Sequence, residues 1–283
     1  CSSNFSFTNS SSIAFGSIAS TLWSFGDAST SSTTNPLHTY SGLGTYSVSL
    51  ISVSNMGCSD TAYLPVSIQP FPIASFISNT VCLNNNTTFT NTSTISSGTI
   101  TGYNWQFGDG TSSVLVNPTH LYSASGSFSV SLTVTSSYGC NQSYLQTVTV
   151  NPLPNVVITA SNNCIGITTT YTNSSSISSG FISNYLWDYN SDGITDNTLV
   201  NGSFTFLTAG TYTTQLTAIS NLNCSATQNM SIVIYPNPVM TFSNNTVCHG
   251  LPTLFTNSST ISTGYINSNA WQFGDALAST LLS

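Results

Sequence analysis

Four tryptophans recur along the chain at a nearly constant interval. Trp23, Trp105, Trp187 and Trp271 are separated by 82, 82 and 84 residues, and a related phrase opens sixteen positions before each: FTNSSSI, FTNTSTI, YTNSSSI and FTNSSTI. A solenoid repeat, which folds only against its neighbours, is much shorter than this period, whereas 82 residues are adequate for an independent domain. The sequence therefore predicts a tandem array of similar domains.

Proline-rich junctions mark where one domain gives way to the next. They read QPFP at Gln69–Pro72, NPLP at Asn151–Pro154 and YPNP at Tyr235–Pro238. Such short, stiff linkers suit a string of closely spaced domains. The predicted repeats are repeat one (1–70, lacking its first strand), repeat two (71–153), repeat three (154–237) and repeat four (238–283, incomplete). The sequence thus looks like a window cut from a longer array.

Each repeat is predicted to be all-β. A glycine precedes segments such as TYSVSLISV, SFSVSLTV and TYTTQLTA, in which apolar and polar residues alternate as in a half-buried strand. About seven short strands with turn signals between them can be counted in a repeat, and no segment has a convincing helical pattern. The predicted fold is an antiparallel β-sandwich.

The segment Tyr103–Val134, YNWQFGDGTSSVLVNPTHLYSASGSFSVSLTV, carries three linked motifs: W-x-F-G-D-G, N-P-x-H-x-Y and G-x-[YF]-x-V-x-L. They recur in repeat one, and AWQFGDA begins them in repeat four. These motifs strongly resemble the PKD domain, and the resemblance extends over the whole chain. Repeat three departs most, with LWDYNSDG and no N-P-x-H-x-Y. The resemblance implies tandem immunoglobulin-like sandwiches that serve as spacers or binding modules, generally without catalysis.

The added VC, FTN and GC features are similar to the PKD repeats of Bacteroidota surface proteins, including gliding adhesins exported by type IX secretion. This similarity implies a structural segment of a long extracellular, cell-surface bacterial protein: a stalk, adhesin or filament. Its partners would be further repeats of the same chain, with self-association into filaments. The alternative is a module that binds a carbohydrate or a protein, such as a glycan or surface ligand, through loops at the sandwich ends. Tyr103, Asn104, Tyr185 and Tyr189 are its candidate contacts.

The charge content excludes one large class of function. The chain has no Lys, no Arg and seven acidic residues, all Asp, so 2% of its residues are charged, against roughly 25% in an ordinary domain. Nucleic-acid binding is not expected, because no cation is present to displace phosphate counterions. No apolar run is long enough for a membrane span. Strand edges without lysine would also let copies of the chain associate.

The seven cysteines fall into two classes. Cys1, Cys82, Cys164 and Cys248 precede the predicted second strand of a repeat, whereas Cys58, Cys140 and Cys224 lie in the last hairpin. This regularity predicts a disulfide framework and an oxidising, extracellular setting. Zinc is not expected, because no C-x-x-C pair is present.

Two disulfide connectivities remain open. Pairing within a repeat would join Cys1 to Cys58, Cys82 to Cys140 and Cys164 to Cys224. In a sandwich these positions lie at opposite ends, about 30 Å apart, and a disulfide needs Cα atoms within about 7 Å. The favoured alternative staples neighbouring repeats, with pairs Cys1–Cys140 and Cys82–Cys224. Cys58, Cys164 and Cys248 would then pair with repeats outside this segment or with another chain.

The stretch WDYNSDGITD in repeat three predicts a calcium site. Asp188, Asn190, Asp192 and Asp196 occupy positions 1, 3, 5 and 9 of a calcium-loop pattern, with Gly193 at position 6. Position 12 is leucine where such a loop has a bidentate carboxylate, and the stretch also aligns with the repeated WQFGDG turn. The stretch is therefore first a longer version of the repeated turn and secondly a candidate calcium site, and no cofactor other than calcium is considered.

No catalytic residues are predicted. His38 and His120 occupy the same repeat position and are expected to be rings wedged at the sandwich edge, and active sites are seldom copied along an array. His249 is the third candidate base, and no other repeat has a histidine at its position. Asp60-Thr61-Ala62 resembles an O-glycosylation motif of Bacteroidota, which makes Thr61 a candidate acceptor. The many N-x-[ST] matches are compositional in a chain so rich in Asn, Ser and Thr.

Overall fold

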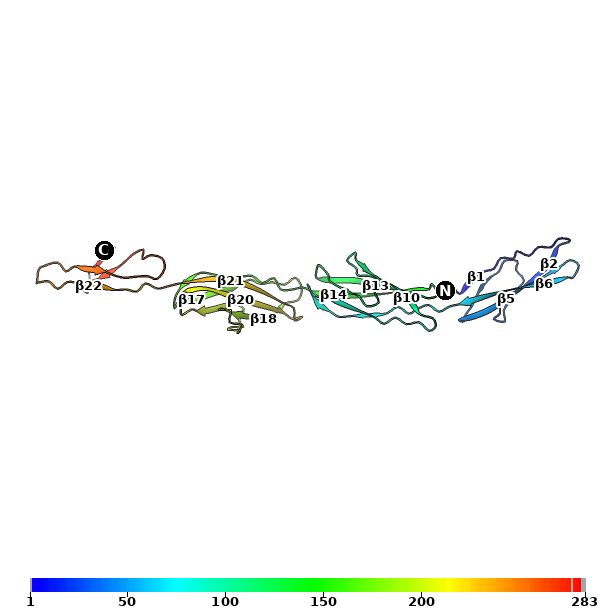
Figure 1. Ribbon diagram of the computed structural model, residues 1–283, viewed down its shortest axis with the longest axis horizontal. Coiled ribbons are helices and arrows are strands. Elements are labelled where there is room, and N and C mark those ends of the chain that lie inside the picture. Colours follow the sequence, from blue (N-terminus) through cyan, green and yellow to red (C-terminus); the bar gives the residue numbers. More distant parts are fainter. Residues whose placement is uncertain (1, 276, 281–283) are drawn as a thin grey trace. The chain divides into compact units, whose positions relative to one another are not determined.

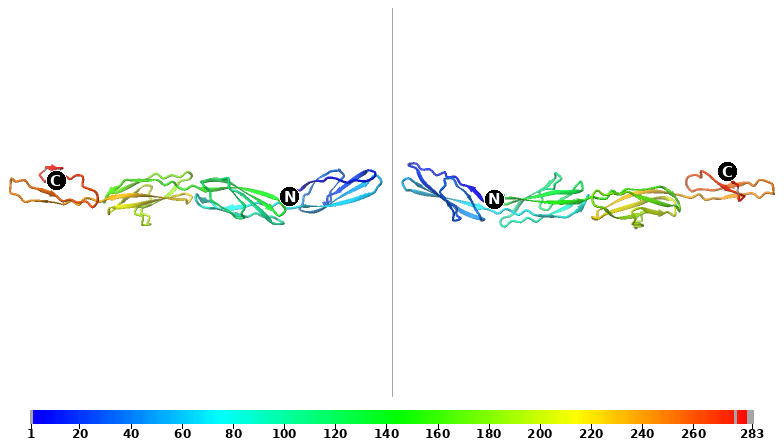
Figure 2. Two further views of the ribbon diagram at one scale, coloured as in Figure 1. Left: turned by 45° about the horizontal axis from the view of Figure 1, so that its top comes forward. Right: turned by 180° about the vertical axis from the view of Figure 1, so that it is seen from behind.

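The computed structural model describes residues 2–275 and 277–280, and it contains strands, turns and bends without a helix in these residues. No coiled ribbon appears in any view of Figures 1 and 2. The described residues accordingly include no helix with the length and hydropathy of a membrane span. The chain divides into two compact units, Cys1–Val150 and Asn151–Ser283, and three separate apolar cores form within them.

Repeat two is a complete sandwich. Its strands are β7 (Phe76–Ser78), β8 (Val81–Cys82), β9 (Thr87–Asn91), β10 (Ile100–Gln106), β11 (Ser112–Ser113), β12 (Thr119–His120), β13 (Gly126–Ser136) and β14 (Asn141–Asn151). One sheet has the order β11-β10-β13-β14-β8 and the other β12-β9-β7. The hairpin β13–β14 is the longest ladder and runs from the Gly126–Val150 pair to the Thr135–Asn141 pair.

The alternation in β13 places one side of the strand in the core, as the sequence pattern predicts. Val130, Leu132 and Val134 are fully buried, and the serines and threonines between them face outward. Trp105 on β10 is also fully buried, and its indole Nε1 donates to the Leu115 carbonyl at 2.9 Å. The predicted immunoglobulin-like, all-β sandwich is therefore confirmed.

Repeat three has the same architecture. Its strands are β15 (Ile158–Ala160), β16 (Asn163–Cys164), β17 (Thr168–Asn173), β18 (Ile182–Asp188), β19 (Gly202–Thr205), β20 (Gly210–Ser220) and β21 (Ser225–Tyr235). The sheets have the orders β16-β21-β20-β18 and β15-β17-β19, and all pairs are antiparallel except the short β16–β21 pair. Trp187 and Leu216 are fully buried between the sheets.

Repeats one and four contain only part of the sandwich. Repeat one has β1 (Asn4–Ser6), β2 (Ile18–Ser24), β3 (Thr30–Ser31), β4 (Leu37–Thr39), β5 (Gly44–Ser54) and β6 (Ser59–Ile68). Repeat four has β22 (Phe242–Asn244), β23 (Phe255–Asn257), β24 (Trp271–Gln272) and β25 (Ala278–Ser279). Among the described residues, repeat one has no counterpart of β7 and repeat four none of β13 or β14. The predicted domain boundaries stay a prediction.

Candidate functional site

The turn that follows the core tryptophan holds four of the five Asp and His side chains of repeats one and two. In repeat two, the Thr111 carbonyl accepts from the Phe107 amide at 3.1 Å, which closes the turn. Gly108 has a φ of +85°, and a Cβ there would lie 2.7 Å from the Ser129 carbonyl oxygen. Gly26 in repeat one is in the same position, 2.8 Å from the corresponding carbonyl. Only glycine fits this turn, because a side chain would meet backbone atoms.

A carboxylate anchors this turn to a histidine. Asp109 accepts from the Thr111 amide at 3.0 Å, and its other oxygen lies 2.6 Å from His120 Nε2. The His120 ring stacks on the Phe107 ring, with centroids 4.2 Å apart. The Tyr122 hydroxyl then donates to the Phe107 carbonyl at 3.0 Å. We call this arrangement the histidine-aspartate turn.

Repeat one contains the same turn. Its members are Asp27, Ser29, His38, Phe25 and Tyr40, with Asp27 Oδ2 2.7 Å from His38 Nε2 and the Tyr40 hydroxyl 3.0 Å from the Phe25 carbonyl. The His38 ring lies 4.0 Å from the Phe25 ring and almost parallel to it. The expectation of a histidine wedged at the sandwich edge agrees with this geometry.

These contacts hold both aspartates in the ionised form. Hydrogen bonds from Ser29 and His38 lower the pKa of Asp27 to about 2, although burial opposes them. Burial likewise raises the pKa of Asp109, but hydrogen bonds from Thr111 and His120 outweigh it and lower that pKa to about 2. Burial, with the nearby Asp109 charge, raises the pKa of the Tyr122 hydroxyl to about 12. The tyrosine therefore acts as a neutral donor.

The histidine-aspartate turn does not have the geometry of a catalytic triad. In a triad, the carboxylate and the hydroxyl contact different nitrogens of the imidazole, so that a proton can pass from the hydroxyl to the ring. Here Asp27 Oδ2 and Ser29 Oγ both lie against His38 Nε2, at 2.7 and 3.4 Å. Ser29 Oγ also donates to Asp27. The three side chains stabilise a turn.

In repeat three the corresponding turn is two residues longer, because Trp187 pairs with Asn197 where Trp105 pairs with Ser113. The Asp188 carboxylate accepts from the amides of Asp192 and Gly193, at 3.3 and 2.9 Å. Asp192 in turn accepts from the Ile194 amide at 2.8 Å, and Asp196 from the Tyr189 amide at 2.7 Å. Each carboxylate is thus used to satisfy backbone N–H groups of the turn.

The predicted calcium ligands do not converge in this conformation. A calcium site gathers six to eight oxygens around one point, but Asn190 turns its amide nitrogen toward Asp192, at 3.0 Å. The described residues contain no group of three His, Cys, Asp or Glu side chains that could hold a metal ion. The residues present therefore do not fit the ion as they stand, and calcium stays a prediction from the sequence pattern.

Comparison with known proteins identifies the fold family. Residues 2–68 and 69–152 match the PKD domain family. The chain belongs to the PKD domain family. The pre-pro-metalloprotease PrtV of Vibrio cholerae is 44% identical over 75 residues, which is 26% of this chain and 8% of that protein. The microbial collagenase of Vibrio alginolyticus is 43% identical over 61 residues, which is 22% of this chain and 8% of the collagenase.

Two solved PKD domains are similar to single repeats of this chain. The PKD1 domain of the V. cholerae metalloprotease PrtV is 38% identical, with a TM-score of 0.27, covering 29% of this chain and 98% of that domain. The PKD1 domain of Vibrio anguillarum Epp is 31% identical, with a TM-score of 0.28, covering 29% and 96%. The chain thus spans less than a tenth of the length of the two relatives above and nearly all of each isolated PKD domain.

Some cysteines of the PKD repeats form disulfides and others are free thiols. Cys82, Cys140 and Cys224 are in disulfides, whereas Cys58, Cys164 and Cys248 are free. Cys1 lies outside the described residues. Because Cys164 is free, the pairing of Cys164 with Cys224 within one repeat is wrong.

The reason is the length of the last hairpin. Cys164 pairs with Tyr235, at the far end of β21 from Cys224. The eleven residues of β21 extend about 36 Å, and a disulfide closes only when the two Cα atoms lie within about 7 Å of each other. The stapling of neighbouring repeats, which leaves Cys58 and Cys164 without a partner in this segment, stays a prediction.

The other predicted site residues lie in different environments. Thr61 is exposed on β6, an edge strand of its sheet, so the proposed glycan acceptor is accessible. Tyr189 is 1% exposed, and Tyr103 and Tyr185 pack against the cores of their repeats. Asn104 is exposed. Three of the four candidate binding residues are therefore part of the core or its margin.

The sequence reasoning missed two groups. It did not connect the aspartate of the G-D-G turn with the histidine eleven residues later, which the carboxylate contacts. It also missed Thr214, which is fully buried in β20 and bonds to both Tyr171 and Tyr189. A threonine at an inward position of an alternating strand was the only available signal for this group.

Proposed function

We propose that this chain is a non-catalytic spacer segment of an extracellular bacterial protein, built from consecutive PKD sandwiches. The proposal rests on the role of the polar side chains in the turn after the core tryptophan. In repeats one and two, the histidine, the aspartate and the Ser or Thr hydroxyl all stabilise this turn. No described turn leaves an acid and a base facing an open cleft. A segment of this kind contributes length and stability, and other parts of the protein would act on substrates.

The extracellular setting has two supports. Three of the described cysteines are in disulfides, and disulfides persist in oxidising compartments. The relatives include a bacterial pre-pro-metalloprotease and a microbial collagenase, which are names of secreted types of enzyme. Attachment to the cell surface and a Bacteroidota origin remain parts of the proposal that rest on sequence motifs.

The proposal includes stapling of neighbouring repeats through Cys1–Cys140 and Cys82–Cys224. Trypsin cannot be used to map these bonds, because the chain has no Lys or Arg. Digestion with pepsin under non-reducing conditions and mass spectrometry should find the Cys82 and Cys224 peptides linked. A Cys82 peptide linked to any other cysteine of this segment would refute the staple.

Immunogold electron microscopy of native cells tests the spacer function. Antibodies against this segment should label fibres or the cell exterior, and labelling confined to the cytoplasm would refute the proposal. The rival reading, a module that binds carbohydrate, predicts instead that the purified chain binds specific sugars on a glycan array. The burial of Tyr189 removes it as a contact for a sugar, so this reading would rest on exposed rings such as Phe15 and Phe181.

A further inference from the structure

Repeat three has an open hollow on one side of its sandwich, between β15 of one sheet and the middle of β21 of the other. Its volume is about 360 Å³. At this point β21 pairs only with β20, because the short strand β16 reaches no further than Ile234 and Tyr235. The lining residues include the apolar Val156, Ile158, Ala160 and Met230 and the polar Thr159 and Gln228. The hollow therefore has an apolar floor and an uncharged polar rim.

Repeat two has an aromatic ring at the same position. Tyr144 and Gln228 are equivalent in the last hairpin, and Phe76 and Ile158 are equivalent in the first strand. In repeat two the Phe76 and Tyr144 rings pack edge to face, with centroids 5.5 Å apart. In repeat three the Gln228 side chain instead donates to the Asn229 carbonyl of its own strand, at 2.9 Å. An aliphatic and an amide side chain thus replace two rings, and the hollow is what they leave.

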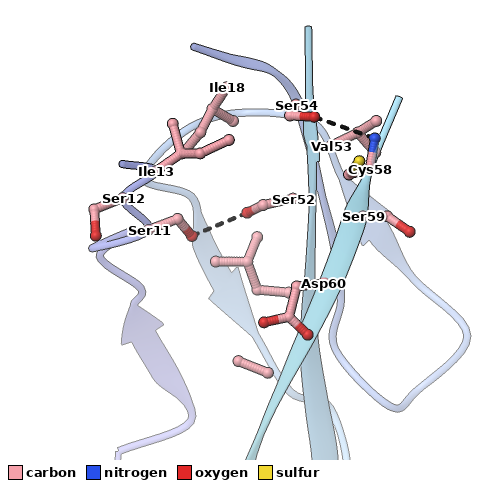
Figure 3. A pocket seen from close by; sticks show the side chains of 12 residues that line it. Ser11, Ser12, Ile13, Ile18, Ser52, Val53, Ser54, Cys58, Ser59 and Asp60 are labelled. Carbon is pink, nitrogen blue, oxygen red and sulfur yellow. Dashed lines mark hydrogen bonds between the residues drawn. The ribbon is translucent and has the colours of Figure 1, made fainter. Parts of the chain in front are cut away.

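Repeat one also has a hollow, with a volume of about 370 Å³, and Figure 3 shows its residues Ser11 and Ser52 joined by a hydrogen bond of 2.9 Å. The described residues of repeat one include no counterpart of β7 or β15. Only repeats two and three can therefore be compared at the position of Tyr144 and Gln228, because both contain the strand that forms one wall there.

The backbone beside the hollow of repeat three can accept a further strand. β15 is the edge strand of its sheet. The Val157 carbonyl accepts from the Ser174 amide at 2.9 Å, so the backbone groups of Val157 are directed toward the neighbouring segment of that sheet. Because successive residues of a strand direct these groups to alternate sides, those of Val156, Ile158 and Ala160 face the open edge. The side chains of the same three residues line the hollow.

The charges around the hollow favour an uncharged partner. Neither β15 nor β21 contains a charged residue. A charged side chain that entered the hollow would lose its hydration without gaining a counter-ion, and this loss is costly. The two strands also lack lysine and proline, the residues that commonly keep a further strand from pairing with a sheet edge. An extended segment of neutral residues therefore meets no electrostatic or backbone obstacle at this edge.

We propose that the hollow of repeat three binds a tyrosine side chain carried by an extended, uncharged segment of a partner protein. The segment lies antiparallel to β15 and forms backbone hydrogen bonds with its open edge, and its ring occupies the place that Tyr144 has in repeat two. This is strand addition to a sheet edge, in which the backbone gives affinity and the side chain gives specificity. The site is on the side of the sandwich, not in its end loops, and it adds a binding role to the spacer function.

Methyl NMR of the full chain, labelled at its three methionines, tests the proposal. Met230 lines the hollow, whereas Met56 and Met240 belong to repeats one and four and serve as internal references. The probe is the acetylated and amidated peptide STYTS. It should shift the Met230 signal, because an aromatic ring changes the magnetic environment of a nearby methyl group, and leave the two reference signals unchanged. A Met230 signal that does not respond to the peptide at millimolar concentration would overturn the proposal.

Substitution of Gln228 locates the site. Gln228→Tyr places the ring of repeat two in repeat three, so it should fill the hollow and weaken peptide binding at least about tenfold. It should also shift the Met230 signal before any peptide is added, which shows that the repeat is folded and the ring is in place. Thr227→Tyr is the matched control, because neighbouring residues of a strand face opposite sides, and it should bind like the unmodified chain. Undiminished binding to the Gln228→Tyr chain contradicts the assigned site.

Three further probes separate the contribution of the ring from that of the backbone. STSTS lacks the ring, STYTS with a methyl group on its tyrosine nitrogen lacks a backbone donor, and p-cresol is the tyrosine side chain as a free molecule. Each should bind at least about tenfold more weakly than STYTS. Equal binding of p-cresol or of the methylated peptide would overturn the added strand, and equal binding of STSTS would overturn the ring as the recognised group. None of these results bears on the spacer function, which the immunogold experiment tests separately.

Discussion

Repeats two and three both have an aromatic residue two positions after the core tryptophan, but they satisfy the backbone carbonyl of that residue in different ways. In repeat two, Tyr122 donates its hydroxyl to the Phe107 carbonyl. In repeat three, phenylalanine replaces this tyrosine, and Thr214 donates to the equivalent Tyr189 carbonyl at 3.1 Å. The donor has moved from one sheet to the other. Both repeats provide a hydrogen-bond donor for this buried carbonyl. A buried carbonyl without a donor would lower the stability of the fold by about 1 to 3 kcal/mol.

The turn after the tryptophan differs in a similar way. Repeat two uses Gly108 because its backbone passes directly against the Ser129 carbonyl. The turn of repeat three is two residues longer and places Ser191 in the left-handed region, with φ of +56°, and Ser191 Oγ donates to the Thr213 carbonyl at 2.7 Å. Thr213 is the counterpart of Ser129. A short turn therefore demands glycine, and a longer one replaces steric fit with a hydrogen bond.

The largest effect is expected at these turn positions. Gly108→Ser should destabilise repeat two by about 3 kcal/mol, because it combines backbone strain with a clash against a carbonyl. Ser191→Gly should change repeat three by less than about 1 kcal/mol, since the lost hydrogen bond is offset by relief of strain. Hydrogen exchange of the full chain, resolved for peptides of each repeat, measures both. Equal losses of stability in the two variants would show that the short and the long turn do not differ in their need for glycine.

The next largest loss of stability is expected from removing the buried Thr214 hydroxyl of repeat three. Thr214→Val should destabilise repeat three by about 2 to 3 kcal/mol, because both the Tyr189 carbonyl and the Tyr171 hydroxyl lose a partner. Adding Phe206→Tyr should recover about 1 kcal/mol by restoring the donor that repeat two uses. The same exchange measurement applies. A double variant no more stable than Thr214→Val would show that the two solutions are not interchangeable.

We predict that repeats one and two lose stability in acid, because each contains a histidine-aspartate turn. The pKa of Asp109 is lowered from 3.8 to about 2 in the folded state. The stability that it contributes is therefore present above pH 4 and is lost as the pH falls toward 2, on the order of 1 kcal/mol after solvent screening. Asp109→Asn should remove this part of the acid dependence in repeat two and leave that of repeat one intact. Acid unfolding followed by repeat-resolved exchange checks it.

The smallest change in stability is expected at two buried threonines that occupy the same position in repeats two and three. Thr87 Oγ1 in repeat two is buried without a hydrogen-bond partner, whereas its counterpart Thr169 accepts from Asn163 Nδ2 at 3.3 Å. Thr87→Val should leave repeat two unchanged within about 0.5 kcal/mol or stabilise it. Thr169→Val should cost about 1 kcal/mol because the Asn163 amide loses one of its two acceptors. The reverse order would indicate that Thr87 has a partner in solution.

Much of this molecule follows from local sequence. Trp105 recurs at the repeat period and is a core residue near the end of β10, and the glycine that precedes the alternating segment, Gly126, begins the longest hairpin. These inferences hold because side-chain alternation and turn chemistry act over a few residues. The cysteine classes were also readable, since the number of residues along β21 sets the distance between the two ends of the last hairpin.

Other features needed the tertiary structure. The aspartates of WDYNSDGITD match a calcium loop in their spacing along the sequence, yet each carboxylate accepts from a backbone amide of its own turn. The spacing of residues does not show where their side chains point. The donor to the Tyr189 carbonyl comes from a strand twenty-five residues away. The sequence by itself determined the strands, the turns and the repeat; the packing of distant segments decided which polar groups meet and which surfaces stay uncovered, because those contacts form only once the two sheets close.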